Sequence, residues 1–387
     1  MIGYDPIKRD NYFHKIQLRK LMKGNLISEE EYQKLSLEIG PSYKETNIFI
    51  NVGLFVFTYI ILSSGIGLMA LIFSGMLSEK TFWFFSFLTA VILFLGLEKV
   101  VIENSNQFRT GIDDAVLYGA MLFTFIGFFL LFENSLFNKP IPIVIFMIVF
   151  FGIPARIYFD RLLFGLTLIS ILSLEFFIFN ELGGIFLLFI PFVTMGLSYL
   201  FFWFSGKQIQ QTDSEAKEQC WEVVQWLSIL SFYLSGNIFI VTELSTELGL
   251  ADAFPEPVRW LFYAFTIVIP IYYIYRGLIK KDLSFVNIGL GTLAIGIFAI
   301  RYYHSILDIE YALLVGGLAL IGIAWLAIKY IKNINQELSV DAEDADSGLK
   351  LESLIIDQAF GKVGVSDNKS FSGKGGEFGG GGGTGSF

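Results

Sequence analysis

Long apolar runs recur along most of the chain, and the short segments between them hold most of the polar and charged residues. About 20 consecutive apolar residues suffice for a helix to cross the ~30 Å hydrocarbon core of a bilayer. Between residues 47 and 332 we count ten such stretches, at about 48–77, 81–102, 112–132, 141–155, 161–180, 184–205, 221–242, 257–276, 284–301 and 309–330. The pattern predicts an all-α fold, a polytopic transmembrane bundle of about ten helices.

The stretch 141–155 gives the weakest signal. It is short, and it ends with Gly152 and Pro154. Proline lacks the backbone N–H that a regular helix needs and clashes with the preceding turn. We expect this stretch to form a tight hairpin with the next one or to be re-entrant, and in the second case nine spans would remain.

Residues 1–46 are polar and mixed in charge, with apolar positions at helical spacing. Gly24 is typical of the position just past a helix end. Ser28 followed three residues later by Glu31 is the pattern of a capping box, which begins a second helix. Gly40 and Pro41 then end that helix. We predict a small cytosolic helical hairpin that serves packing or self-association.

Residues 333–387 form a polar tail. Five acids lie between Glu337 and Asp346, Leu351–Phe360 has the pattern of a short amphipathic helix, and glycine dominates the end of the chain. A Gly-rich segment buries too little apolar surface to offset the entropy lost on ordering. We predict a disordered tail, with a docking segment ending at Phe387 as the alternative.

Composition narrows the class of protein. Hydrophobic residues make up 54% of the chain and charged residues 16%, against about 25% charged residues in a soluble domain. A soluble enzyme is therefore excluded. The single cysteine, Cys220, excludes a disulfide framework, and with His14 and His304 it cannot form a Cys/His metal cluster. The net charge of −9 does not favour nucleic acid as a partner. We expect no cofactor.

The placement of Lys and Arg predicts the topology. If the N-terminus is cytoplasmic and ten spans alternate, most basic residues fall near cytoplasmic ends, as the positive-inside rule requires. The exceptions, near the outer ends, are Lys80, Lys139, Arg259 and Arg301. We expect both termini to be cytoplasmic and the membrane to be a bacterial inner membrane. The first forty residues lack the apolar core of a cleavable signal peptide.

Standard catalytic signatures are missing from the sequence. It holds no phosphate-binding loop, no His-Glu-x-x-His and no Gly-x-Ser-x-Gly. The candidates are instead charged residues in or beside apolar stretches, since an ionisable group inside a membrane is costly and often functional. Glu175 lies deepest, and the alternative is an outer-end residue that reaches the interface.

Two further polar groups flank the spans. Arg156, Asp160 and Arg161 interrupt the apolar sequence, and Arg156 and Asp160 would face the same way on one helix. They indicate either a cytoplasmic vestibule or an anchor for the hairpin. The second group is a predicted outer rim, a binding surface or a pH-sensitive gate, or alternatively a loop whose charges pair among themselves: Arg301, His304, Asp308 and Glu310. His304 changes charge near neutral pH.

Asp113 and Asp114 open the stretch 112–132. Carboxylates at a helix N-terminus are favoured by the helix dipole. This stabilising role is the simpler interpretation, and a proton or cation site is the alternative.

The segment Leu21–Glu30 (LMKGNLISEE), followed by many spans, resembles a domain-of-unknown-function family of uncharacterised bacterial multi-pass membrane proteins with a short N-terminal helical segment. The resemblance implies the architecture and transfers no site residue.

Three hypotheses for function follow. The first is a non-enzymatic membrane protein with a structural, sensory or assembly role, which contacts protein partners through the hairpin and tail. The second is a secondary transporter or channel for a small solute or ion, with a path near Glu175, the pair Arg156 and Asp160, and the rim at residues 301–310. The third is a membrane-embedded enzyme. A polar cavity at mid-depth would favour transport.

Overall fold

The computed structural model describes residues 3–24, 26–72, 81–132, 139–250, 254–280 and 282–303, with isolated positions between 311 and 325. These residues belong to one compact unit, Met1–Ile334. The predicted tail, its short helix and most of the tenth apolar stretch lie outside the described residues.

Every regular element in the described part of the chain is helical, which confirms the predicted all-α class. The helices are α1 (Pro6–Lys23), α2 (Glu29–Ile39), α3 (Ile48–Ile72), α4 (Phe82–Gly96), α5 (Ile112–Phe132), α6 (Pro140–Tyr158), α7 (Arg161–Leu182), α8 (Ile190–Gln211), α9 (Glu215–Gly236), α10 (Ile238–Glu247), α11 (Glu256–Lys280) and α12 (Leu283–Tyr303). A π-helical segment, η1 (Leu97–Asn104), continues α4, and a 3₁₀ turn, η3 (Gly184–Phe189), precedes α8.

Eight helices in the described ranges are long and apolar enough to cross a membrane. The number is nine if α9 and α10, bent by 68° at their junction, form one broken span. The predicted stretch 221–242 is therefore interrupted. The cause is Asn237, whose side-chain oxygen accepts hydrogen bonds from the N–H groups of Phe239 and Ile240 at 3.0 and 3.4 Å and so caps a new helix.

Helix α6 is longer than expected. It continues through Pro154 to Tyr158, so the prediction that this stretch ends at Gly152–Pro154 was wrong. Proline in a helix interior removes one hydrogen bond, and here it lies within the last turns, where few backbone bonds follow it.

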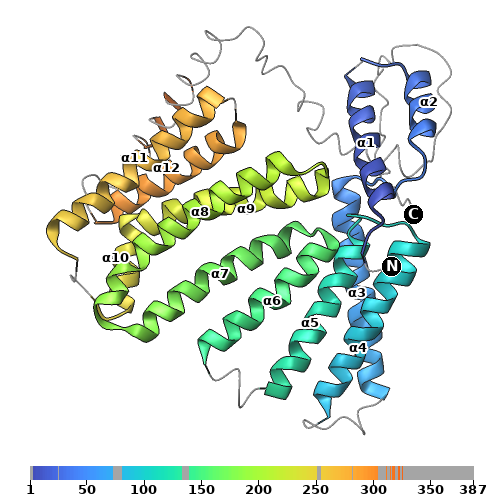
Figure 1. Cartoon of the computed structure of the whole chain (residues 1–387), viewed down its shortest axis with the longest axis horizontal. Coiled ribbons are helices and arrows are strands. Elements are labelled where there is room, and N and C mark those ends of the chain that lie inside the picture. The colour runs from blue at the N-terminus through green and yellow to red at the C-terminus, as the bar shows by residue number, and fades with distance from the viewer. Residues whose placement is uncertain are drawn as a thin grey trace, which may run out of the picture. The chain divides into compact units, whose positions relative to one another are not determined.

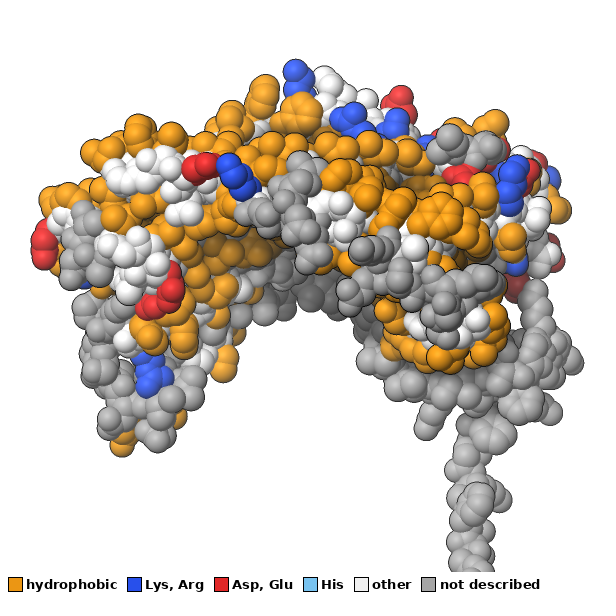
Figure 2. Space-filling model, turned by 90° about the horizontal axis from the view of Figure 1, so that it is seen from below, with side chains coloured by type: hydrophobic (Ala, Val, Ile, Leu, Met, Phe, Trp, Pro, Cys, Tyr) orange, Lys and Arg blue, Asp and Glu red, His pale blue; other side chains and the backbone are white. Residues whose placement is uncertain are grey.

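Neighbouring helices pair along the chain, as Figure 1 shows: α4 packs on α5, α6 on α7, α8 on α9, and α11 on α12. The helices expose large apolar side chains such as Ile60, Phe84 and Val268. Figure 2 shows such side chains over much of one face, with few charged ones among them. Apolar surface of this extent is unfavourable in water, so the bundle is a membrane protein.

In the N-terminal hairpin, the break between α1 and α2 and the end of α2 lie where the sequence predicted. Gly24 caps α1 at its C-terminus, and the capping box of α2 is complete. The Glu31 N–H donates to Ser28 Oγ at 3.2 Å, and the Ser28 N–H donates to Glu31 Oε2 at 2.8 Å. These bonds to Ser28 lower the pKa of Glu31.

Phe108 joins this hairpin to the membrane helices. It is 1% exposed, and its ring centroid lies 4.7 Å from that of Tyr4, 5.2 Å from that of Tyr12 and 5.6 Å from that of Tyr43. Burial of a phenylalanine contributes about 1.5–3 kcal/mol, and favourable aromatic pairs add roughly 0.5–1.5 kcal/mol each. The N-terminal segment is thereby fixed against the loop that precedes α5.

Candidate functional site

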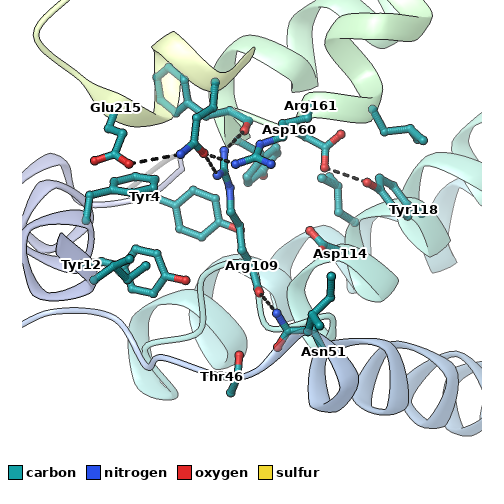
Figure 3. A pocket seen from close by; sticks show the side chains of 18 of the residues that line it. Tyr4, Tyr12, Thr46, Asn51, Arg109, Asp114, Tyr118, Asp160, Arg161 and Glu215 are labelled. Atoms are coloured by element: carbon teal, nitrogen blue, oxygen red, sulfur yellow. Dashed lines mark hydrogen bonds between the residues drawn. The ribbon is translucent and has the colours of Figure 1, made fainter. Parts of the chain in front are cut away.

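A cavity of about 550 Å³ lies where α5, α7 and α9 begin and α6 ends, and the N-terminal segment forms one of its walls (Figure 3). The residues that line it with polar groups come from five separate stretches of the chain: Tyr4, Tyr12, Lys20, Thr46, Asn51, Arg109, Asp114, Tyr118, Tyr158, Asp160, Arg161, Glu215 and Gln219. The site is at one end of the spans and not at mid-depth.

The loop before α5 has an unusual backbone that positions Arg109. Arg109 itself has a φ of 54° and Gly111 a φ of 84°, values that residues other than glycine rarely adopt. At Gly111 a Cβ atom would lie 2.0 Å from the carbonyl oxygen of Asn51, so only glycine fits. Asn51 Nδ2 in turn donates to the Arg109 carbonyl oxygen at 2.9 Å. Helix α3 thus holds the loop, and the Arg109 side chain crosses the cavity (Figure 3).

Asp113 stabilises the same loop through hydrogen bonds to its carboxylate. Its carboxylate is 1% exposed and accepts the Arg109 N–H at 2.7 Å, the Thr110 N–H at 2.9 Å and the Thr110 hydroxyl at 3.1 Å. A fourth bond comes from the Tyr4 hydroxyl at 2.7 Å. Burial, and then the nearby Asp113 charge, raises the pKa of Tyr4 well above its usual value. Asp113 therefore ties the N-terminus to the membrane helices.

Two guanidinium groups meet inside the cavity. Arg109 and Arg161 both donate to the same oxygen, Oε1 of Gln219. Among the residues described, neither arginine has a carboxylate within salt-bridge distance. A guanidinium has five N–H donors in a planar fork that matches carboxylate and phosphate oxygens. Two such groups sharing one neutral acceptor form an arrangement suited to an anion.

Two carboxylates face the cavity from another side (Figure 3). Asp160 caps α7 by accepting the Leu163 N–H at 2.8 Å, and its other oxygen accepts the Tyr118 hydroxyl at 2.7 Å. Burial raises the pKa of Asp160, although these two hydrogen bonds oppose the shift. Asp114 lines the same wall. The cavity therefore offers an acidic wall next to a basic one.

Two further polar atoms of the lining lack partners. Thr46 Oγ1 and Asn51 Oδ1 are buried and have no hydrogen bond in the described structure. Buried polar groups are almost always satisfied, so each exception needs an explanation. A polar ligand in the cavity would provide hydrogen-bond partners for both atoms.

The structure places the site residues predicted from the sequence in different parts of the molecule. Asp160 and Arg161 share the cavity. Arg156 is exposed and lines a different, smaller cavity of about 220 Å³. It does not face Asp160 on one helix, because α6 ends at Tyr158 and Phe159 turns the chain with a φ of 51°.

Glu175 is buried inside α7, 7% exposed, and accepts a hydrogen bond from Thr194 Oγ1 at 2.8 Å on α8. Its other oxygen has no partner in the described ranges. Arg301 lies in the last turn of α12. His304, Asp308 and Glu310 lie outside the described residues, so the predicted outer rim stays a prediction.

Sequence reasoning missed Tyr4, Asn51, Arg109 and Gln219 as site residues. Asp113 and Asp114 drew attention only as N-terminal residues of a helix. One signal was available, the turn-forming residues Asn104, Ser105 and Asn106 followed by Gly111 before an apolar stretch, which is typical of a loop.

No group of three or more His, Cys, Asp or Glu residues in the described ranges has a metal-binding arrangement. Comparison of the chain with protein-family models, curated proteins and solved structures found no match. Function is therefore inferred from geometry.

Proposed function

We propose that the chain is a non-enzymatic, sensory protein of a bacterial inner membrane, with both termini cytoplasmic. It binds a small zwitterionic solute between its N-terminal hairpin and the ends of its spans. The single observation that carries the proposal is the cavity in which Arg109 and Arg161 share one neutral acceptor beside Asp114 and Asp160.

Charge complementarity defines the solute. An anionic group, carboxylate or phosphate, suits the two guanidiniums, because charge-assisted bidentate hydrogen bonds are among the strongest in proteins. A cationic group on the same solute suits Asp114 and Asp160. The tyrosines Tyr12, Tyr118 and Tyr158 supply the intervening wall.

The same cavity couples binding to the hairpin. Tyr4, Tyr12, Phe13, Ile16 and Lys20 come from the N-terminal segment, and the other lining residues come from the membrane helices and the segments next to them. A solute that fits only the docked arrangement stabilises docking by RT ln(1 + [L]/Kd), about 2.7 kcal/mol at a hundredfold excess over Kd. The hairpin also exposes Leu26 and Leu37, which supports contact with a protein partner there.

The test is thermal unfolding of the full chain in lipid nanodiscs with phosphoethanolamine, inorganic phosphate or ethanolamine as probes. We expect the zwitterion to raise Tm most, phosphate less and ethanolamine least. Arg109→Gln and Arg161→Gln should abolish the shift. Lys207→Gln, which removes a charge outside the cavity, should leave it unchanged. Equal shifts in all four proteins would refute the proposal.

Transport is the second candidate, and the bend between α9 and α10 favours it, because discontinuous helices are common at transporter binding sites. The buried Glu175 lies on the adjacent α7. Uptake of the same probes into sealed vesicles containing the protein would favour transport, and binding without uptake would favour sensing.

A further inference from the structure

A second cavity, separate from the polar one, opens sideways between α8, α9 and α11. Its volume is about 360 Å³. The floor is buried and includes Met195, Ile229 and Ile269, whereas the rim residues Tyr199, Val268 and Tyr272 are 59%, 59% and 52% exposed. Those rim residues belong to the apolar surface of the spans, so the groove opens toward lipid and not toward water.

Arg276 lies at one end of this groove. Its guanidinium lies 4.9 Å from the ring centroid of Phe202 and 4.6 Å from that of Phe285. Within the described part of the chain no carboxylate lies within salt-bridge distance of it. Asp282, six residues further along the chain, caps α12: its Oδ1 accepts the N–H groups of Ser284 and Phe285 at 3.0 and 3.3 Å. The aromatic rings hold the guanidinium in place and leave its N–H donors for an anion.

A buried hydroxyl points to the same groove. Ser198 is 0% exposed, lines the groove, and its Oγ has no hydrogen-bond partner among the described residues. The other serine of the lining, Ser228, donates to the Val224 carbonyl oxygen at 2.6 Å and is satisfied. Ser198 is thus one polar atom available to an occupant inside an otherwise apolar lining.

The length of the groove matches one leaflet. Along α11 its lining runs from Phe265 to Arg276, which corresponds to a rise of ~16 Å in a helix. Half of a bilayer's hydrocarbon core is roughly 15 Å. Arg276 lies one turn before the end of α11 at Lys280, the depth at which a long basic side chain reaches the headgroups.

We propose that this groove binds one anionic phospholipid from the leaflet on the hairpin side, with an acyl chain along α11 and the phosphate on Arg276. The site is independent of the solute cavity, and either proposal can fail without the other. The positive charge of Arg276, which has no carboxylate within salt-bridge distance among the described residues, favours the anionic lipid over a zwitterionic one.

Native mass spectrometry of the full chain tests this, with micelles supplied with phosphatidylglycerol or with phosphatidylcholine of the same acyl chains. We expect wild type to retain phosphatidylglycerol in preference. Arg276→Gln should lower that retention roughly tenfold, the loss of about one charge-assisted contact. Lys280→Gln, a charge-matched change on the same helix, should not. Arg276→Lys should recover part of the preference, which separates loss of charge from loss of folding.

A substitution at the exposed rim gives a second, independent readout. Val268→Trp should fill the groove and lower retention of both lipids while the protein still elutes as one species. The proposal is overturned if wild type retains the two lipids equally, if Lys280→Gln matches Arg276→Gln, or if soluble glycerol phosphate displaces the lipid completely.

Discussion

The hydrogen bond between Tyr4 and Asp113 gives the sharpest test of how the hairpin is held. Tyr4→Phe removes only the hydroxyl that donates to Asp113 Oδ2 at 2.7 Å. The ring packing around Phe108 remains. The substitution therefore isolates one polar contact between two parts of the chain that are 109 positions apart.

The expected magnitude follows from the environment of that contact. Tyr4 is 9% exposed and Asp113 is 1% exposed, so water cannot replace the lost donor. A hydrogen bond to a charged group contributes about 1.5–3 kcal/mol. Since about 1.4 kcal/mol is a tenfold change in an equilibrium constant, the undocked population of the hairpin should rise roughly 10- to 150-fold.

Hydrogen exchange of the α1 amides, measured on the full chain in nanodiscs, reports this population. We expect faster exchange in α1 for Tyr4→Phe and no change for Tyr32→Phe, the matched substitution on α2. Exchange rates in Tyr4→Phe within threefold of wild type would refute the assigned role of Asp113.

Three further outcomes are expected. Gly111→Ala should lower stability by at least ~2 kcal/mol, from the positive φ and the clash with α3, whereas Gly53→Ala, with open space around it, should not; chemical denaturation measures both. The raised pKa of Asp160 means that the folded state holds this proton to higher pH than the unfolded chain does. Its stabilisation is complete below about pH 4 and is lost as pH rises through the folded pKa, so Asp160→Asn should gain stability relative to wild type as pH rises above about 4, and a constant difference would exclude the effect. Ser28→Ala should weaken α2 by about 1 kcal/mol, seen as faster amide exchange in its first turn, and Ser36→Ala should leave that exchange unchanged.

Local signals were enough to predict the hairpin and most spans. The boundaries at Gly24 and Gly40 and the Ser28–Glu31 capping box depend on residues within one turn of each other. Apolar runs near 20 residues likewise identify a span without any tertiary information. The class of fold is therefore encoded in short segments.

The breaks in regular helices were harder to predict. Asn237 interrupts an apolar run because its side chain caps a new helix. The Ile238 N–H then donates to Thr266 Oγ1 on α11 at 3.0 Å. Pro154 fails to end α6. In both cases the outcome depends on neighbouring helices or on position within the helix, which a single run of sequence does not contain.

The cavity could not be predicted because its contacts join distant positions. Arg109 and Gln219 are 110 residues apart, and Arg161 and Gln219 are 58 apart. The sequence identified Asp160 and Arg161 as notable charges but associated them with Arg156, the nearest basic neighbour. Phe159, which has a left-handed backbone conformation, lies between Arg156 and Asp160 and ends the helix that the two residues would have shared.

The N-terminal hairpin packs against the start of α9 and forms one wall of the cavity. Gln17 Nε2 donates to Glu215 Oε2 at 3.1 Å. In a Cys220→Ala background, cysteines at positions 17 and 215 should be joined by a short bis-maleimide in native membranes. Cysteines at 17 and 139 should not, because position 139 lies at the far end of α6, ~28 Å along the helix from the cavity. Product from the second pair, or none from the first although each cysteine reacts singly, would contradict the account.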